Sequence, residues 1–237
     1  VQTCALPISV TTMCGRFVAT QTPQQLAAFF GATTQEEPTQ PNYNVAPTTE
    51  VLGVVAHDGQ RVIESFRWGL VPSWAKDISI GSKMINARAE TLADKPSFKG
   101  LFRHRRLLVP MDGFYEWRKG PSGKIPMFIQ RTDGAPVVVA GLWSVWKEPG
   151  SPPDEPWLHT CTLITTQANA DMAPVHDRMP VILDPKDWDE WLDPRNDDVA
   201  ELAQLLRPAA DHVVTMHAVS TRVNSVRNKG SDLIVPI

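Results

Sequence analysis

The segment Met13-Cys14-Gly15-Arg16-Phe17 places a cysteine directly after a methionine. Removal of Met13 and everything before it would leave Cys14 with an α-amine and a thiol on adjacent carbons. Reference pKa values are about 8 for the amine and about 8.5 for the thiol, so part of the amine is unprotonated near neutral pH. Such a 1,2-aminothiol condenses with an aldehyde to an imine and then closes to a thiazolidine, and it can also attack an amide carbonyl. The alternative is that Cys14 is a small apolar residue entering a first strand.

Asn86 and Arg88 stand one residue apart in the segment Asn86-Ala87-Arg88-Ala89-Glu90-Thr91. In an extended segment their side chains point the same way, which suits two groups that grip one ligand. The competing interpretation is a surface ion pair between Arg88 and Glu90.

Glu116 and His176 are candidates for proton transfer. Glu116 lies in the aromatic run Gly113-Phe114-Tyr115-Glu116-Trp117, where burial would raise its pKa and make it a proton shuttle. The competing interpretation is a glutamate that faces water from an edge strand.

His176 and Arg178 lie between Pro174 and Pro180, which restrict the loop. His176 could therefore act as a general acid or base, and Arg178 as a phosphate ligand. A structural histidine is the plainer alternative.

Trp68 and Trp74 belong to the run Arg67-Trp68-Gly69-Leu70-Val71-Pro72-Ser73-Trp74. Indole rings beside guanidinium groups suit a single strand of nucleic acid, because bases stack on the rings and phosphates pair with the cations. Core packing is expected for at least one of the two tryptophans.

Short strands are expected to position these groups. Thr22, Pro23 and Gln25 form a helix start, which predicts a helix over Pro23–Phe30 that stops at Gly31. Two β-rich runs flank a turn signal at residues 57–60 and predict a hairpin. Further expected elements are a basic helix over Pro96–Arg106, strands at 107–109, 113–118, 127–131, 137–143, 160–166, 180–183 and 213–219, and acidic helices at 184–192 and 197–206. Strands joined by short turns favour an α+β fold with an antiparallel, barrel-like sheet and flanking helices.

Composition narrows the class of protein. The 237 residues carry a net charge of −3, and no apolar run approaches the length of a membrane span. The charge is uneven: residues 61–131 are strongly basic and residues 132–211 strongly acidic, which hints at a polyanion-binding face. The three cysteines form neither a disulfide framework nor a zinc pattern, so we expect no metal, no cofactor and a reducing, cytoplasmic setting. Residues 1–12 are interpreted as a leader or non-native extension, and residues 13–237 as one domain.

Six segments occur in an order that closely resembles the SRAP family, the SOS response-associated peptidase or abasic site processing proteins. They are Met-Cys-Gly-Arg-Phe at 13–17, Tyr-Asn-Val-Ala-Pro at 43–47, the run from Arg67 to Trp74, the run from Asn86 to Thr91, Gly-Phe-Tyr-Glu-Trp at 113–117, and His-Asp-Arg-Met-Pro at 176–180.

The resemblance implies a protein that binds single-stranded DNA and crosslinks covalently to abasic sites. Cys14 would form a thiazolidine with the ring-opened deoxyribose, Asn86 would hold the sugar or the amine, Glu116 would move protons and His176 would assist closure or reversal. DNA contacts would come from Arg16, Asn44, Pro47, Trp68, Trp74, Arg88 and Arg178. We expect a nucleoid-associated monomer, with removal of the residues before Cys14 as the peptidase activity.

Two other classes stay open at this point. An N-terminal-nucleophile amidohydrolase would also begin with Met-Cys-Gly, although it leaves the Trp68–Trp74 run and the His176–Pro180 run without a role. A DNA-binding module without covalent chemistry would not need Cys14.

Overall fold

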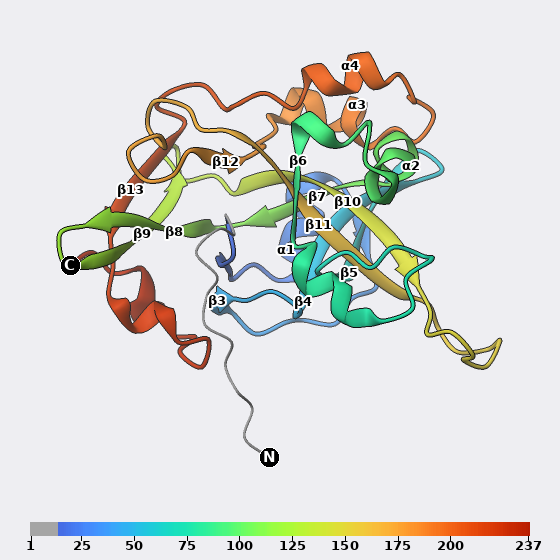
Figure 1. Ribbon diagram of the computed structural model, residues 1–237, viewed down its shortest axis with the longest axis horizontal. Coiled ribbons are helices and arrows are strands. Elements are labelled where there is room, and N and C mark those ends of the chain that lie inside the picture. The colour runs from blue at the N-terminus through green and yellow to red at the C-terminus, as the bar shows by residue number, and fades with distance from the viewer. Residues whose placement is uncertain (1–13) are drawn as a thin grey trace.

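The computed structural model describes residues 14–237 (Figure 1). The expected leader at 1–12 and the bond that precedes Cys14 lie outside the described residues. The fold is α+β, as expected: the strands form two sheets, and short helices lie around them.

One sheet is antiparallel throughout, with the spatial order β13-β9-β8-β1-β3. Its strands are Val214–Ala218, Gly123–Arg131, Gly113–Gly120, Phe17–Ala19 and Asn42–Val45. β1 and β3 were not predicted, because strands of three and four residues have too few positions to display an alternating pattern.

The second sheet contains a closed barrel. Its order is β12-β11-β10-β7-β4-β5-β2, and a further parallel pairing of β11 with β5 joins β4, β5, β7, β10 and β11 into a ring. These strands are Arg178–Pro180, Leu158–Gln167, Val137–Trp146, Arg106–Met111, Glu50–His57, Gln60–Trp68 and Thr33–Thr34. β6 (Asn86–Arg88) lies parallel to β11 outside the ring. The barrel-like sheet is therefore confirmed, with parallel contacts where the chain returns to β5 and β11.

Local signals placed several elements correctly. Helix α1 spans Pro23–Phe30, where Thr22 and Gln25 form the reciprocal capping box and Gly31 ends the helix in the left-handed conformation. The β4–β5 hairpin turns at Asp58 and Gly59, both with positive φ, as a two-residue turn requires. Remaining helical segments are η1 (Ile78–Lys83), η2 (Ala89–Thr91), α2 (Pro96–His104), η3 (Pro185–Asp187), α3 (Trp188–Leu192), α4 (Val199–Gln204), η4 (Thr221–Asn224) and η5 (Ser231–Ile234).

The basic helix ends earlier than predicted, and the reason is Arg106. This buried residue begins β7 and donates to the carbonyl oxygens of Phe102, Arg103, Trp191, Asp193 and Asn196. A guanidinium fits five acceptors only at a fixed point among these chain ends, so α2 stops at His104. The strand expected at 180–183 is also displaced, since the pairing of β12 with β11 covers Arg178–Pro180.

Two apolar layers hold the fold together. One fills the space between the two sheets and includes Cys14, Phe17, Trp68, Met111 and Phe114. The other packs the helices on the outside of the barrel, with Phe30, Phe102, Trp188 and Trp191 among its members. Within residues 14–237 no helix is long and apolar enough to cross a membrane.

Candidate active site between the two sheets

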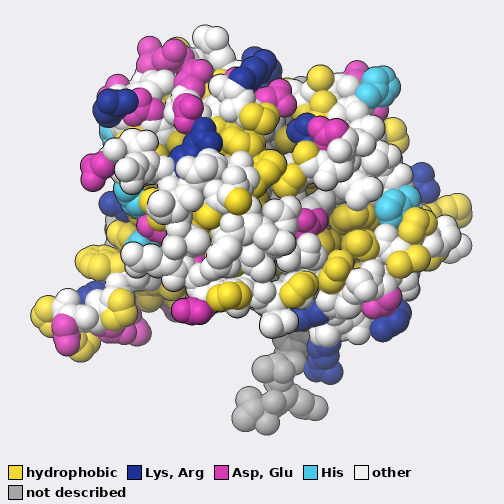
Figure 2. Space-filling model, turned by 180° about the vertical axis from the view of Figure 1, so that it is seen from behind, with side chains coloured by type: hydrophobic (Ala, Val, Ile, Leu, Met, Phe, Trp, Pro, Cys, Tyr) yellow, Lys and Arg dark blue, Asp and Glu magenta, His cyan; other side chains and the backbone are white. Residues whose placement is uncertain are grey.

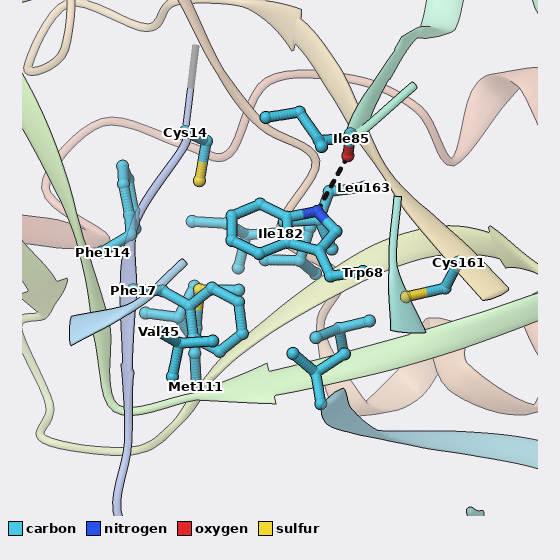
Figure 3. Packing of buried hydrophobic residues seen from close by; sticks show 14 of the residues in the cluster. Cys14, Phe17, Val45, Trp68, Ile85, Met111, Phe114, Cys161, Leu163 and Ile182 are labelled. Carbon is cyan, nitrogen blue, oxygen red and sulfur yellow. Dashed lines mark hydrogen bonds between the residues drawn. The ribbon is translucent and has the colours of Figure 1, made fainter. Parts of the chain in front are cut away.

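Cys14 lies just before β1, which is placed between β8 and β3 in the antiparallel sheet. β1 pairs with β8 through Phe17 opposite Phe114, and this register brings Glu116 level with the start of the chain's first strand. The main-chain nitrogen of Cys14 donates a hydrogen bond to Oε1 of Glu116, across 102 residues of sequence. Cys14 is fully buried, and its side chain points into the apolar cluster between Phe114 and the Trp68 indole (Figure 3).

Cys14 has a strained backbone. Its φ is +45°, in the left-handed region that a residue with a Cβ seldom adopts. The torsion includes the carbonyl carbon of the preceding residue, so the conformation depends on the bond that joins Cys14 to residue 13. Strain of this kind is found where the surrounding structure overrides local preference, often at functional sites.

Glu116 is buried, as predicted, and does not face water from an edge strand. Only 3% of the residue is exposed, and burial raises the pKa of its carboxyl to about 7. Hydrogen bonds from the main-chain nitrogens of Cys14 and Trp117 oppose that rise, as does the charge of Lys124. A carboxyl with a pKa near neutrality can both accept and donate a proton under ordinary conditions.

The thiol of Cys14 is held in its neutral form. Burial raises its pKa well above the ordinary value, and the neighbouring Glu116 carboxylate raises the pKa further. The sulfur is therefore not a pre-formed thiolate.

His176 lies in the loop before β12 and is partly buried, with 29% of its side chain exposed. Its Nδ1 accepts a hydrogen bond from the main-chain nitrogen of Arg178 at 3.1 Å and also lies 2.8 Å from Oδ1 of Asp177. The two contacts favour opposite protonation states of Nδ1. Burial lowers the pKa of His176 more than Asp177 raises it, so we take the neutral imidazole with its proton on Nε2.

Asn86 and Arg88 lie on one side of β6, as the spacing predicted. Ala87 between them is buried in the outer apolar layer, while Asn86 is half-buried and Arg88 is exposed. Ile85, next to Asn86, contacts the same cluster as Cys14, and its carbonyl accepts the indole N–H of Trp68 at 2.9 Å (Figure 3). The cluster thus connects β6 to the strand that carries Cys14.

Arg178 differs from the expectation of an open phosphate ligand. Its guanidinium binds Glu90 through two hydrogen bonds of 3.0 and 2.9 Å and the carbonyl of Thr165 at 2.7 Å. Glu90 therefore pairs with Arg178, and the alternative of an Arg88–Glu90 ion pair is wrong. The Arg88 side chain is exposed, and its charge contributes to the lowered pKa of Glu90.

Three of the expected DNA contacts are buried and need correction. Trp68 is 0% exposed, so its ring packs in the core and cannot stack on a base. Arg16 and Asn44 are 7% and 1% exposed, and Nη1 of Arg16 donates to Oδ1 of Asn44 at 2.9 Å. Sequence pattern does not separate a buried polar pair from a solvated one, because burial depends on segments distant in the chain.

Trp74 and Pro47 have the exposure that contact with a ligand requires. Trp74 is 62% exposed on the loop that follows Trp68, and Pro47 is half-buried in the loop between β3 and β4. The Pro47 loop is fixed to β5 because the main-chain nitrogen of Thr48 donates to the carbonyl of Trp68 at 2.7 Å.

Lys124 was missed by sequence reasoning. It lies on β9 and acts electrostatically on both Glu116 and His176, lowering the pKa of each. Asp177 also acts on both groups, in the opposite direction. Glu116 and His176 therefore share one electrostatic environment, although 60 residues separate them. A lysine near a hairpin turn has no local feature that marks it out.

Comparison with known proteins identifies the family of this chain. The family model described as SOS response associated peptidase (SRAP) matches residues 13–226. The chain belongs to the SRAP family. It is 41% identical over 225 residues to the abasic site processing protein YoqW of Bacillus subtilis strain 168, covering 94% of this chain and 99% of that one. Identity is 33% over 232 residues to YedK of Escherichia coli K12 and 35% over 229 residues to HMCES of Gallus gallus, both also named abasic site processing proteins. Those matches cover 95% and 84% of this chain, and 100% and 67% of the relatives.

Solved structures of similar shape support the SRAP fold. A protein from Bacteroides thetaiotaomicron superposes with a TM-score of 0.84 at 24% identity, covering 94% of this chain and all of that one. A phage-related protein from Bordetella bronchiseptica superposes with a TM-score of 0.66 at 30% identity, covering 87% and 94%.

Proposed function

We propose that this SRAP protein processes abasic sites by binding single-stranded DNA and linking Cys14 covalently to the ring-opened deoxyribose. One observation carries the proposal: the nitrogen of Cys14 contacts a buried carboxyl whose pKa is about 7. Once residue 13 is removed, that nitrogen is an amine with an acid–base group already in place. Relatives that are 33–41% identical to this chain over the aligned residues are named abasic site processing proteins.

The chemistry proceeds through two bonds to one carbon. The free amine of Cys14 attacks the C1′ aldehyde to give a carbinolamine, which loses water to form an imine. The thiol then adds to the imine carbon, a C–S bond forms, and the sulfur's proton ends on the ring nitrogen. Amine, thiol and aldehyde thus become a thiazolidine and one water.

Glu116 serves each proton transfer at the nitrogen. It accepts a proton from the ammonium to free the amine and returns it to the departing hydroxyl of the carbinolamine. The neutral thiol favours this order of events, because a raised sulfur pKa keeps the thiol from competing for the aldehyde as a thiolate. His176, neutral and close enough to share Lys124 and Asp177 with Glu116, assists ring closure or reopening.

Binding of the strand uses the exposed groups around this site. Trp74 offers an indole face for a base, and Arg88 offers an exposed guanidinium for a phosphate beside Asn86, which holds the sugar. Arg178 contributes if a phosphate displaces Glu90 from its guanidinium. Pro47 shapes the strand's path, whereas Arg16, Asn44 and Trp68 act from inside the protein.

The same residues support a route by which the protein exposes its own amine. The thiol of Cys14 passes its proton to the Glu116 carboxylate as the sulfur attacks the carbonyl of residue 13. The C–N bond then breaks, the leaving nitrogen takes that proton from Glu116, and water hydrolyses the resulting thioester to free the thiol and release the residue 13 carboxylate. Cleavage of that bond also abolishes the +45° torsion at Cys14, so release of strain favours the step.

The test compares two protein forms on two oligonucleotides. The form that begins at Cys14 is incubated with a single strand that has or lacks one abasic site, beside the form that retains residues 1–13. We expect a denaturation-resistant adduct only between the Cys14-terminal form and the abasic strand. Full adduct formation by a chain whose intact Val1 terminus is verified by mass spectrometry would exclude the amine as the nucleophile. Glutamine hydrolysis without an adduct would favour the amidohydrolase class instead.

A further inference from the structure

Asn44 is buried, and its side chain forms hydrogen bonds to the loop at residues 223–229 near the C-terminus. Its Nδ2 donates to the carbonyls of Val223 at 3.1 Å, Ser225 at 3.0 Å and Asn228 at 2.9 Å. Three carbonyls that converge on one buried amide fix the shape of the loop, and the carbonyl of Ser225 also accepts from the main-chain nitrogen of Asn228 at 3.1 Å.

The same loop is tied to the strands of the candidate active site. Arg16, two residues after Cys14, donates from Nη1 to the carbonyl of Val223 at 3.0 Å. Trp117, next to Glu116, donates from its indole to Oδ1 of Asn224 at 2.8 Å. The loop therefore takes its position from the two strands that carry Cys14 and Glu116.

Outward, this loop is basic. Residues 221–237 contain Arg222, Arg227 and Lys229 against one acid, Asp232. Arg222 pairs with Asp232 at 2.9 Å, whereas no ion pair among the described residues includes Arg227 or Lys229, and both are exposed. Figure 2 shows Lys and Arg side chains gathered at the lower edge of the molecule, over the segment that contains η4 and η5 in Figure 1.

We infer that the loop Ser225–Lys229 binds phosphates of the DNA strand that carries the lesion, and that Asn44 and Arg16 are positioning residues for it. This inference rests on the proposed function, because the lesion must sit at Cys14. A strand residue advances about 3.3 Å, so Arg16 lies within roughly 7 Å of Cys14 along the chain. The loop that Arg16 holds therefore borders the site, and phosphates on one side of the lesion reach Arg227 and Lys229. A rigid loop with two free cations loses little entropy when it binds.

The first test removes the two charges in the form that begins at Cys14. Arg227→Gln with Lys229→Gln should weaken binding to an intact single strand and make the slope of log K against log salt shallower by about 1.4, at roughly 0.7 per phosphate. The matched control is Lys99→Gln with Lys186→Gln, which removes two exposed charges from α2 and η3 and should leave the slope unchanged. An unchanged slope in the loop variant overturns the inference.

The second test separates positioning from folding. Asn44→Asp occupies the same space and still accepts from Arg16 but cannot donate to the three carbonyls. We expect Asn44→Asp to make the slope of log K against log salt shallower by about as much as the loop variant does. Combining Asn44→Asp with the two charge changes should make the slope no shallower. Additive losses, or weaker binding at the wild-type slope, would contradict a positioning role. Should Asn44→Asp fail to fold, the charge variant decides alone.

The adduct assay keeps this inference apart from the proposed function. With abasic DNA at saturating concentration, the loop variant should reach the wild-type yield of adduct, since no group at Cys14 has changed. If the loop variant gives the wild-type adduct yield and the wild-type salt slope, the loop is excluded as a phosphate-binding segment, and the proposed function is unaffected. Absence of an adduct from the wild-type protein would instead exclude the chemistry on which the inference rests.

Discussion

Replacement of Glu116 by glutamine should change the pH dependence of stability in the form that retains residue 13. The native carboxyl has a pKa of about 7, against 4.5 for an unperturbed glutamate. The native state therefore binds more protons than the unfolded state between these values, and stability is lost as pH rises from 4.5 through 7. At about 1.4 kcal/mol per pH unit, the full loss amounts to roughly 3 kcal/mol.

Glu116→Gln removes this loss, because an amide stays neutral and its oxygen still accepts from the nitrogen of Cys14. We expect the variant and the wild type to unfold at similar denaturant concentrations near pH 4, and the variant to be more stable by up to roughly 3 kcal/mol at pH 8. Chemical denaturation between pH 4 and 8 measures the difference. Glu148→Gln, on an exposed loop, is the matched control and should follow the wild type.

The reasoning is refuted if the difference between Glu116→Gln and the wild type is the same at every pH, since a buried carboxyl that ionises cannot give that result. The same variant in the form that begins at Cys14 should form the adduct about 10²–10⁴-fold more slowly, which corresponds to about 3–5 kcal/mol of lost acid–base assistance. The two measurements together show whether the Glu116 carboxyl both causes the pH dependence of stability and assists adduct formation.

Three other changes test the remaining parts of the site. Cys14→Ser keeps the amine and loses the thiol, so the adduct should stop at an imine that borohydride traps; a stable adduct without borohydride would contradict the thiazolidine. Arg88→Ala should make the salt slope of single-strand binding shallower by about 0.7, the contribution of one phosphate, and an unchanged slope would remove Arg88 from the contact surface. His176→Asn should slow ring closure or reversal without changing affinity for an intact strand, because the imidazole is neutral and carries no charge for a phosphate; wild-type rates in both directions would leave His176 a structural residue.

The sequence by itself determined the elements whose signals are local. Thr22, Pro23, Gln25 and Gly31 are sufficient to begin and end α1, because capping satisfies groups within a few residues. The β4–β5 hairpin follows in the same way from its turn. Order of motifs also identified the family, and the residue types of Cys14 and Glu116 were enough to suggest the chemistry.

Local sequence signals did not predict the positions of the short strands. β1, β3 and β6 span three or four residues, and their hydrogen bonds are made with strands far away in the sequence. The early end of α2 is similar, because Arg106 satisfies carbonyls that come from positions up to 90 residues away. No local pattern encodes the location of such partners.

Tertiary structure alone decided which polar residues are exposed and which are buried or paired. Arg16, Asn44 and Arg178 belong to segments that resemble a DNA-binding family, yet the first two lie inside the protein and the third pairs with Glu90. The contact of the Cys14 nitrogen with Glu116 and the raised carboxyl pKa also arise only when β1 lies against β8. Residue types determine what chemistry is available, whereas burial and charge, which depend on distant segments brought together by folding, determine which group performs it.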